Sequence, residues 1–328
     1  MPESAPLVSA AIESVPVVGH FRDGRFFNPG AGAHGFSQLW KWVTNRKPGP
    51  WRKWTPSTPG PTPPAQVQGA ELRVTFVNHA TVLLQTEGLN ILTDPVWSFR
   101  VSPVGFAGPA RHRDPGIRFA DLPSIHCILI SHNHYDHFDT PTLKRLARAH
   151  RPAVFCPLGL AKRLRGLGFR DVVEMDWGQS QPWKEMRVHC TEAQHFSART
   201  PFDRNKTLWC GWVVETQHGN LYFAGDTGFG DFFAALRERF STMRLALLPI
   251  GAYEPEWFMG PVHMTPEQAV EAASIVSATT SIGIHFGTFA LADDGEAAPV
   301  ERLRAALQGR EDAGRFRVLV EGEGHAVP

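Results

Sequence analysis

The sequence predicts an α/β protein in which two mixed β-sheets pack face to face and helices cover the outside. Short strand-like runs dominate the first half of the body, and strands alternate with helices in the second half. This order is typical of two packed sheets with outer helices. The chain has 328 residues, 42% of them hydrophobic and 20% charged, which supplies enough apolar material for one large body. We therefore expect one folded body over residues 71–328, preceded by an arm over residues 1–70.

The body begins with three short β-type runs, at residues 72–77, 81–85 and 90–93. The dipeptide Glu87-Gly88 between the second and third runs predicts a hairpin. A wholly apolar strand at 127–130 then ends at a group of histidines. The remaining elements are predicted as strands at 153–156, 187–190, 208–215, 220–224, 246–250 and 281–284, helices at 141–149, 232–240 and 266–276, and a last helix and strand after Pro299.

The arm contains a short amphipathic helix, predicted at residues 36–43, and a connection at 46–69 that is too proline-rich for a helix or a central strand. Its tryptophans allow two interpretations. They pack the arm onto the body, as large aromatic side chains usually do, or they contact a lipid headgroup region, where tryptophan beside lysine is favoured. The residues concerned are Trp40, Trp42, Trp51 and Trp54, interleaved with Lys41, Arg52 and Lys53.

The charge balance and cysteine spacing exclude several classes of protein. Lys plus Arg number 33 against 32 for Asp plus Glu, so nucleic acid is not an expected partner. The four cysteines, at 127, 156, 190 and 210, lack the paired spacing of a structural zinc site and are predicted to be reduced core thiols. Glu3 and Glu13 make the N-terminus a poor secretory signal, and no window reaches the roughly 20 apolar residues of a membrane span. We expect a cytoplasmic protein, with peripheral membrane contact through the arm left open and the oligomeric state unassigned.

The strongest motif in the chain is Ser131-His132-Asn133-His134-Tyr135-Asp136-His137, directly after the apolar strand. Residues two apart in an extended segment or tight turn point to the same side, so His132 and His134 can bind one metal ion while Asp136 and His137 turn toward a second. A buried group of imidazoles without a metal would be costly to fold. The motif therefore predicts a metal site, with zinc favoured and iron or manganese as alternatives.

Six residues cannot complete two coordination shells, so further ligands are expected at other strand ends. His195, Asp226 and His285 each follow a predicted strand. For Asp226 the alternative is a capping role at the start of the next helix, but a carboxylate that bridges two cations is favoured.

With these ligands, the chain resembles the metallo-β-lactamase superfamily, in which a His-x-His-x-Asp-His signature and a later His, Asp and His form a dinuclear site in an αββα sandwich. The resemblance covers residues 72–320. Within the superfamily the chain looks most like the branch containing N-acyl-phosphatidylethanolamine-hydrolysing phospholipase D. The segments that carry this narrower resemblance are 78–81, 92–98 (Leu92-Thr93-Asp94-Pro95-Val96-Trp97-Ser98), 102–103, 108–111, 249–255, 257–259, 263–269 (His263-Met264-Thr265-Pro266-Glu267-Gln268-Ala269) and 285–289.

The resemblance implies a ligand assignment and a reaction. One metal ion would be bound by His132, His134 and His195, the other by Asp136, His137 and His285, with Asp226 bridging; Asp136 and Asp226 are accordingly catalytic candidates. Two cations about 3.5 to 4 Å apart can hold one hydroxide between them at neutral pH. We expect this hydroxide to attack a phosphodiester of an N-acyl-phosphatidylethanolamine-like phospholipid, releasing phosphatidic acid and an N-acylethanolamine.

Five other residues are candidates for roles around the metals. His263 is the candidate for contacting the phosphoryl group or protonating the leaving oxygen, with an ordinary loop histidine as the alternative. Asp94 and His79 are expected to orient metal ligands. Tyr135 and Tyr253 are expected to line the pocket or simply to pack.

Two other functions stay open at this point. The same metals could open a lactone or another small ester, as in ascorbate-6-phosphate lactonase-like relatives, or the chain could be a metal-binding scaffold without catalysis. The full ligand set argues against the scaffold.

Overall fold

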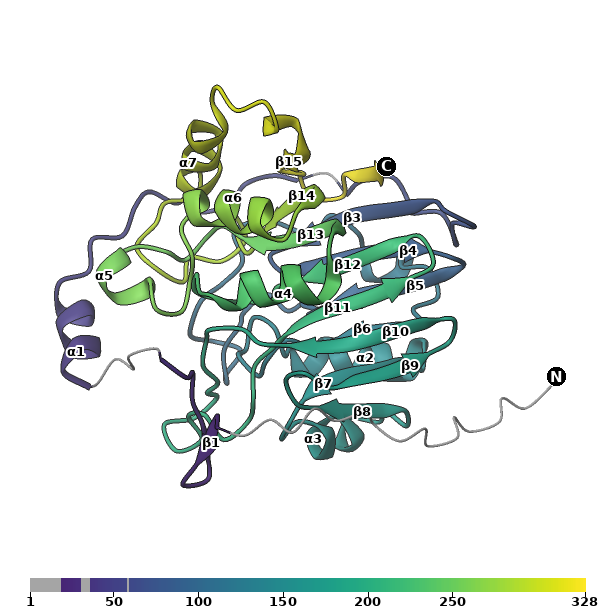
Figure 1. Cartoon of the computed structure of the whole chain (residues 1–328). Helices are drawn as coiled ribbons and strands as arrows, with labels where there is room; N and C mark the ends of the chain where they lie inside the picture. Colours follow the sequence, from purple (N-terminus) through teal and green to yellow (C-terminus); the bar gives the residue numbers. More distant parts are fainter. Residues whose placement is uncertain (1–18, 31–35, 58) are drawn as a thin grey trace.

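The computed structural model describes residues 19–30, 36–57 and 59–328. Two sheets of seven strands each lie face to face, and helices cover their outer sides (Figure 1). This confirms the predicted αββα sandwich. In each sheet one half is antiparallel and the other half is parallel, so both sheets are mixed.

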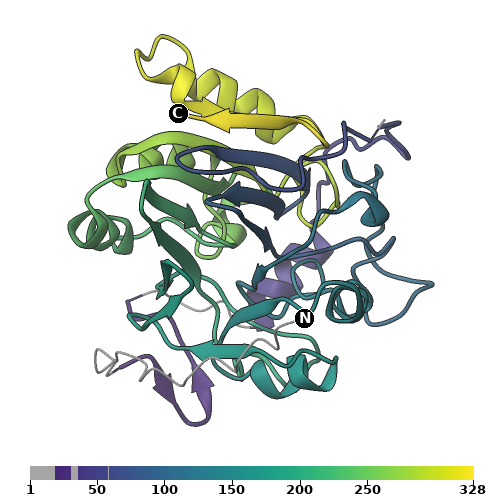
Figure 2. The same cartoon turned by 90° about the vertical axis from the view of Figure 1, so that its right-hand side faces the viewer.

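The first sheet has the strand order β16-β3-β4-β5-β6-β7-β8. Neighbours are antiparallel from β16 to β5 and parallel from β5 to β8. Figure 2 shows the C-terminal strand, in yellow, beside the dark blue β3. The strands are β3 (Leu72–Asn78), β4 (Thr81–Thr86), β5 (Leu89–Thr93), β6 (Cys127–Leu129), β7 (Ala153–Pro157), β8 (Val172–Met175) and β16 (Gly324–Val327).

The second sheet has the strand order β15-β14-β13-β12-β11-β10-β9. Here β9 to β12 are antiparallel and β12 to β15 are parallel. The strands are β9 (Ser180–Trp183), β10 (Met186–Thr191), β11 (Gly211–Thr216), β12 (Gly219–Phe223), β13 (Met243–Pro249), β14 (Ala278–Ile284) and β15 (Phe316–Arg317).

Helices bury the outer faces of both sheets. The first sheet is covered by α2 (Thr140–Ala149) and α3 (Ala161–Gly166), whose Leu143, Leu146 and Leu164 join a buried cluster with Ile128 and Val154. The second sheet is covered by α4 (Phe232–Phe240), α6 (Pro266–Ile275) and α7 (Ala298–Leu307). Two single turns, η1 (Phe119–Asp121) and η2 (Ala313–Arg315), complete the body.

Aromatic side chains fill the space between the sheets. The ring of Phe155 on β7 lies 6.3 Å from that of Trp183 on β9 and 6.2 Å from that of Trp212 on β11. The Trp212 Nε1 donates a hydrogen bond to the carbonyl of Ile130 across the interface, so its only polar atom is satisfied although the residue is fully buried. All four cysteines are buried and free, as predicted.

The arm lies against the body. It comprises the hairpin β1 (Phe21–Arg22) and β2 (Arg25–Phe26), α1 (Phe36–Thr44) and an extended connection without helix or strand. Ion pairs tie that connection to the loop before α7: Arg46 contacts Asp293 at 2.7 Å and Arg52 contacts Glu296 at 2.9 Å. The boundary between arm and body near residue 70 stays a prediction, although the first sheet begins at Leu72.

Of the four tryptophans of the arm, two pack on the body and two are exposed. Trp42 stacks on Phe258 of α5 (Glu256–Met259) with ring centroids 5.0 Å apart, and Trp51 donates from Nε1 to the carbonyl of Asp294. Trp40 and Trp54 are exposed. Packing on the body therefore accounts for only half of them.

Several strands differ from the prediction, each for a local reason. Residues 208–210, predicted as strand, precede β11 because Leu208 and Cys210 donate their backbone N–H groups to Leu158 and Ser131 instead of to a neighbouring strand. The strand β9 was not predicted because it contains Pro182; proline is tolerated there since β9 is at the sheet edge. The strand β8 was also missed, and where a single last strand was expected after Pro299 there are two, β15 and β16.

The pairing pattern brings many strand ends to one place. In the first sheet β3, β5 and β6 run in one direction, and in the second sheet β10, β12 and β14 do so. Their carboxyl ends lead into the loops that carry the predicted ligands. Among the described residues no helix is long and apolar enough to cross a bilayer.

Candidate metal centre

The histidine motif forms a tight loop between β6 and α2. Its backbone turns because the N–H groups of His137 and Phe138 both donate to the carbonyl of His134, at 3.2 and 2.7 Å. The turn reverses the chain, so that His132 and His134 lie on one side and Asp136 and His137 on the other. His132 and His134 thus belong to one group of ligand-capable side chains, and Asp136 and His137 to another.

Three imidazoles converge on one side of the loop. The Nε2 of His132 lies 2.8 Å from the Nδ1 of His134, which lies 3.3 Å from the Nε2 of His195. His195 reaches this position from the segment after β10. Its orientation is held by its Nδ1, 2.9 Å from the carbonyl of Val262, and by Asn28, whose Nδ2 donates to the His195 carbonyl.

A second group of ligand-capable atoms lies on the other side. It consists of His79, Asp136, His137 and His285, whose candidate atoms all lie within 4.8 Å of one another. The Oδ2 of Asp136 is 3.2 Å from the Nε2 of His137 and 3.5 Å from the Nε2 of His285. His285 follows β14 and has a positive φ of 61°, a conformation that turns its side chain out of the strand.

Asp226 connects the two groups. Its Oδ2 lies 3.0 Å from the Nε2 of His285 and 3.1 Å from that of His137, and also 3.8 Å from the Nε2 of His195 and 3.9 Å from that of His132. The segment after Asp226 does not begin a helix at once, since α4 starts at Phe232. The capping alternative for Asp226 is therefore wrong.

Asp94 contacts His137 directly and His132 through Ser131. Its Oδ2 is 2.7 Å from the Nδ1 of His137, and its Oδ1 accepts from the backbone N–H of Ser131 at 2.7 Å. The Ser131 hydroxyl donates to Asp94 at 2.5 Å and lies 2.8 Å from the Nδ1 of His132. One buried carboxylate thus supports an imidazole on each side of the centre.

His79 could orient a metal ligand or bind a metal ion itself. Its Nε2 lies 2.8 Å from the Oδ2 of Asp136, consistent with the predicted orienting role, and His79 also belongs to the second ligand group. His79 lies in the turn between β3 and β4 with φ 48°. Its backbone N–H donates to the Thr288 hydroxyl, and its carbonyl accepts from the N–H of His285.

Burial keeps several imidazoles of the centre neutral. It lowers the pKa of His132 and His195 well below the usual range, that of His134 and His263 to about 4, and that of His79 to about 3. A neutral imidazole has the lone pair that a metal ion requires.

Unlike His79, the other two imidazoles of the second group, those of His137 and His285, carry positive charge. Burial alone would lower the pKa of His137 and His285, but the carboxylates of Asp226 and Asp136 outweigh it, raising the pKa of His137 well above its usual range and that of His285 to about 9. Burial likewise disfavours charged carboxylates, yet His137 and the neighbouring imidazoles hold the pKa of Asp136 and Asp226 well below their usual range. The two carboxylates are therefore anionic and face positive charge.

The residues fit a divalent metal ion. The Nε2 atoms of His137 and His285 and the Oδ1 of Asp226 are buried without a hydrogen-bond partner among the described residues. Unpaired buried polar atoms are uncommon because each one costs free energy. Nitrogen and carboxylate oxygen donors in this number are the ligand set of zinc and of comparable transition metals.

Arg199 supports the histidine loop through hydrogen bonds, a role that the sequence did not predict. Its Nη1 donates to the carbonyls of Asn133 and Phe138, at 2.8 and 2.9 Å, and its guanidinium carbon lies 3.7 Å from the centre of the Tyr135 ring. The Tyr135 hydroxyl donates to the Arg199 carbonyl in return. The sequence offers no signal for this contact, because Arg199 is more than 60 residues from the loop.

A cavity of about 890 Å³ opens onto the centre. His134, Asp136, Asp226, His263 and His285 form its polar end. The arm and the region of α5 contribute most of the apolar wall. The residues of that wall include Phe27, Leu39, Trp42, Phe196, Phe258 and Met259, and the cations on it are Arg22 and Arg204.

His263 lies where the prediction needs it, at the polar end of the cavity. Its ring centroid is 5.1 Å from that of His195 and 5.3 Å from that of His285. The two tyrosines do not line the cavity. Tyr135 packs on Arg199, and Tyr253 is buried with the guanidinium of Arg302 4.9 Å from its ring centre.

Comparison with known proteins assigns the chain to a family. Residues 89–286 match the model of the β-lactamase superfamily domain. The chain is 40% identical over 254 residues to the N-acyl-phosphatidylethanolamine-hydrolyzing phospholipase D 1 of Caenorhabditis elegans, covering 74% of this chain and 71% of that protein. It is 41% identical over 244 residues to an uncharacterized protein of Mycobacterium tuberculosis, covering 73% of this chain but only 65% of that relative.

Among solved structures, a possible metal-dependent hydrolase from Veillonella parvula superposes with a TM-score of 0.62 at 18% sequence identity, covering 78% of this chain and 99% of that one. This likeness concerns the fold.

Proposed function

The chain belongs to the β-lactamase superfamily as a metal-dependent hydrolase, and we propose that it is a phosphodiesterase of the phospholipase D type. Its proposed substrate is an N-acyl-phosphatidylethanolamine-like phospholipid, cleaved to phosphatidic acid and an N-acylethanolamine. The similarity to the nematode phospholipase supports this choice. The observation that carries it is the shape of the large cavity: polar at the metal centre, apolar along its walls, with two arginines.

The cavity suits a molecule with an anionic head and apolar chains. Arg204 lies over the ring of Phe196 at 4.5 Å, and Arg22 lies on the same cavity. Their positive charge favours a phosphodiester over a neutral ester or lactone. Apolar walls bury acyl chain surface at about 25 cal/mol per Å², which an uncharged small ester could not exploit.

Two divalent ions, with zinc favoured, complete the proposal. One ion would be held by His132, His134 and His195, and the other by Asp136, His137 and His285. Asp226 would bind both ions. When bound, such ions lower the pKa of water toward 7 and neutralise charge on phosphoryl oxygens. The chain itself supplies the orientation of these ligands through Asp94 and the loop geometry.

His263 is proposed to donate a hydrogen bond to the phosphoryl group or to the leaving oxygen. It lies on the cavity, beside the ligands, and its Nδ1 has no hydrogen-bond partner among the residues that the structure describes. A phosphoryl group or a leaving alkoxide at the polar end would be the natural partner of that nitrogen.

Peripheral contact with a bilayer is part of the proposal. On α1, Leu39, Trp40 and Val43 are exposed, and Trp257 on α5 is also exposed. The two helices are neighbours (Figure 1). Lys41 lies 4.9 Å from the Trp257 ring centre. Since Leu39 also lines the cavity, an interface on this face would place lipid at the cavity mouth. Indole rings beside a lysine favour the headgroup region.

A substrate panel tests the function. Zinc-loaded protein is incubated with N-acyl-phosphatidylethanolamine in vesicles, with bis-p-nitrophenyl phosphate and with a set of lactones, and products are identified by mass spectrometry. We expect phosphatidic acid and N-acylethanolamine, and loss of both after chelation. Lactone opening with intact phospholipid would replace the proposal by the lactonase alternative. Arg204→Met should raise KM for the phospholipid and for bis-p-nitrophenyl phosphate, because both are anionic phosphodiesters, but should leave KM for a neutral lactone unchanged.

Vesicle sedimentation tests the bilayer contact. The double variant Trp40→Ser, Trp257→Ser should bind phosphatidylethanolamine vesicles at least about tenfold more weakly than wild type. Val320→Ser is the matched control, since Val320 is equally exposed but lies near the C terminus. Equal loss in the control, or no loss in the double variant, would contradict an interface on α1 and α5.

A further inference from the structure

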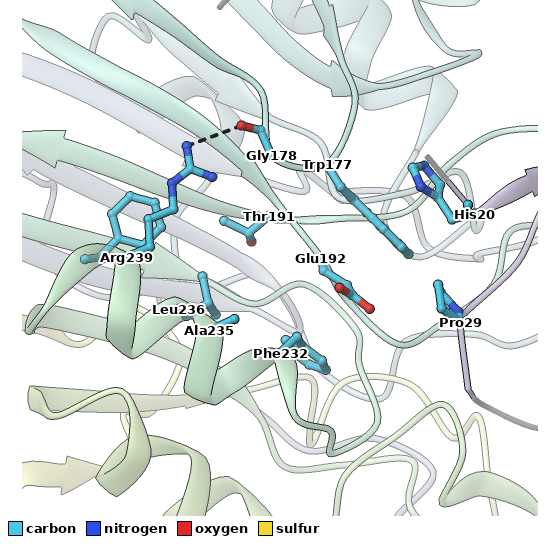
Figure 3. A pocket seen from close by; sticks show the side chains of 12 residues that line it. His20, Pro29, Trp177, Gly178, Thr191, Glu192, Phe232, Ala235, Leu236 and Arg239 are labelled. Atoms are coloured by element: carbon cyan, nitrogen blue, oxygen red, sulfur yellow. Dashed lines mark hydrogen bonds between the residues drawn. The ribbon is translucent and has the colours of Figure 1, made fainter. Parts of the chain in front are cut away.

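A second cavity has a volume of about 410 Å³ and is drawn in Figure 3. Four parts of the chain form it: the arm at Gly19, His20 and Pro29, residues 177–178, residues 191–192 at the end of β10, and the side of α4 that carries Phe232, Leu236 and Arg239. None of these residues lines the large cavity. Nothing in the proposed hydrolysis uses this space.

The carboxylate of Glu192 is the unusual feature of this cavity. It projects into the space between Trp177 and Phe232 (Figure 3). The residue is half-buried, and no described side chain or backbone group forms a hydrogen bond or ion pair with it. Burial raises the pKa of Glu192. A carboxylate partly removed from water without a partner costs free energy, and a bound cation would recover that cost.

The surroundings of Glu192 favour an organic cation over a metal ion. Glu192 belongs to no group of metal-ligating side chains among the described residues, and a single carboxylate does not complete a coordination shell. Aromatic rings are present instead. The ring of Trp177 stacks on that of His20 with centroids 4.5 Å apart, and Phe232 lies on the opposite wall. Aromatic faces attract alkylated ammonium groups.

Arg239 limits where the positive charge can lie. It lines the far end of the cavity, where its Nη2 donates to the Gly178 carbonyl at 3.3 Å (Figure 3). Arg239 and Glu192 form no ion pair with each other. Like charges repel, so a cationic head is directed to the Glu192 end.

We propose that this cavity binds a small organic ammonium ion, whose charged nitrogen lies against Glu192 and whose alkyl groups lie against Trp177 and Phe232. The ligand would contact the segment that leads from β10 to His195. It would also contact the arm, in which Asn28 donates to the His195 carbonyl. The bound ion would therefore lie behind one ligand of the metal centre.

Calorimetric titration of the metal-loaded protein tests the site. The probe is choline, and its neutral isostere 3,3-dimethyl-1-butanol, which has the same shape without the charge, is the matched ligand. We expect choline to bind and the isostere to bind at least about tenfold more weakly, a difference of about 1.4 kcal/mol. Equal binding of the two, or binding of neither, would overturn the proposal.

Two variants locate the binding. Glu192→Gln should weaken choline binding at least about tenfold, whereas Glu185→Gln, at an exposed glutamate at the other end of β10, should not. Ala235→Phe keeps Glu192 but fills the cavity from α4, and it should also abolish binding. Choline binding that survives Ala235→Phe would mean attraction to a surface carboxylate and would refute a cavity site. Thermal unfolding of each variant confirms that it is folded.

A comparison of phosphocholine with choline shows whether the ammonium group comes from a lipid headgroup or from a free amine. If the group belongs to a lipid headgroup, the phosphate extends toward Arg239 and phosphocholine binds more tightly than choline. If choline binds more tightly, the ligand is a free amine. In both cases the Glu192→Gln variant must lose binding of the ligand.

Discussion

Replacing Arg199 by methionine should loosen the loop that carries four of the proposed metal ligands. The guanidinium of Arg199 donates from Nη1 to two carbonyls of this loop, that of Asn133 between His132 and His134 and that of Phe138 directly after His137. Methionine fills a similar volume but has no donor. Both carbonyls would then lose a charged partner in a region that water does not reach, since Arg199 is buried.

The size of the effect follows from these contacts. A hydrogen bond to a charged group contributes about 1.5 to 3 kcal/mol, so the two bonds contribute about 3 to 6 kcal/mol. The guanidinium over the Tyr135 ring adds about 1 kcal/mol. Burial works in the opposite direction, since it lowers the pKa of Arg199 to about 10, a sign that the charged form is poorly solvated. We expect a net loss of about 3 kcal/mol in the free energy of unfolding.

Urea unfolding of the metal-free protein measures the loss of stability, and a chelator competition measures the loss of zinc affinity. Arg199→Met should lower the free energy of unfolding by about 3 kcal/mol and weaken zinc binding at least about tenfold. Arg199→Lys should recover only part of both, because one ammonium group cannot match the planar fork of the guanidinium. Arg204→Met is the matched control, with a change within about 0.5 kcal/mol. Wild-type stability and zinc affinity in Arg199→Met would refute the reasoning.

Three further predictions concern the centre and the arm. Asp226→Asn should abolish hydrolysis and reduce zinc per chain in metal analysis while leaving the circular dichroism spectrum unchanged; activity near wild type would sink the dinuclear scheme. His263→Gln should keep full metal content but lower kcat by about 100-fold or more, and an unchanged kcat would exclude a hydrogen bond from His263 to the phosphoryl group or the leaving oxygen. Although Glu296 is buried, hydrogen bonds from Arg52 and Thr55 and the charge of Arg113 lower its pKa to about 2. Because this folded-state pKa is depressed, the stability that Glu296 contributes is complete above about pH 4.5 and is lost as the pH falls toward 2. Urea unfolding of Glu296→Gln against wild type should therefore show a difference that shrinks over this range, and a constant difference would exclude the ionised carboxylate as its cause.

The residues of the metal centre could be read from the sequence because their chemistry is local. The motif from His132 to His137 follows an apolar strand, and its alternation and turn place ligands on two sides whatever the rest of the fold does. His195, Asp226 and His285 could be found because each follows a predicted strand, and the ends of parallel strands meet at one edge of a sheet. The structure brings all seven residues together.

Other parts of the site could not be predicted, because they depend on contacts between distant segments. Nothing near Arg199 in the sequence indicates that it would support the histidine loop, and nothing near Tyr253 indicates that it would be buried under Arg302. The strand β16 pairs with β3 from the other end of the chain. Such pairings are set by the packing of whole faces, which short segments do not encode.

The sequence by itself determined the ligand residues, the mixed sheets and the outer helices, since strand and helix periodicity and ligand spacing are local properties. Only the tertiary structure decided what surrounds the centre. The arm supplies Phe27, Leu39 and Trp42 to the wall of the large cavity, and Glu192 is left without a partner in the second cavity. The shape and charge of a cavity arise where several segments meet, so the sequence specifies the metal chemistry more directly than the molecule on which it acts.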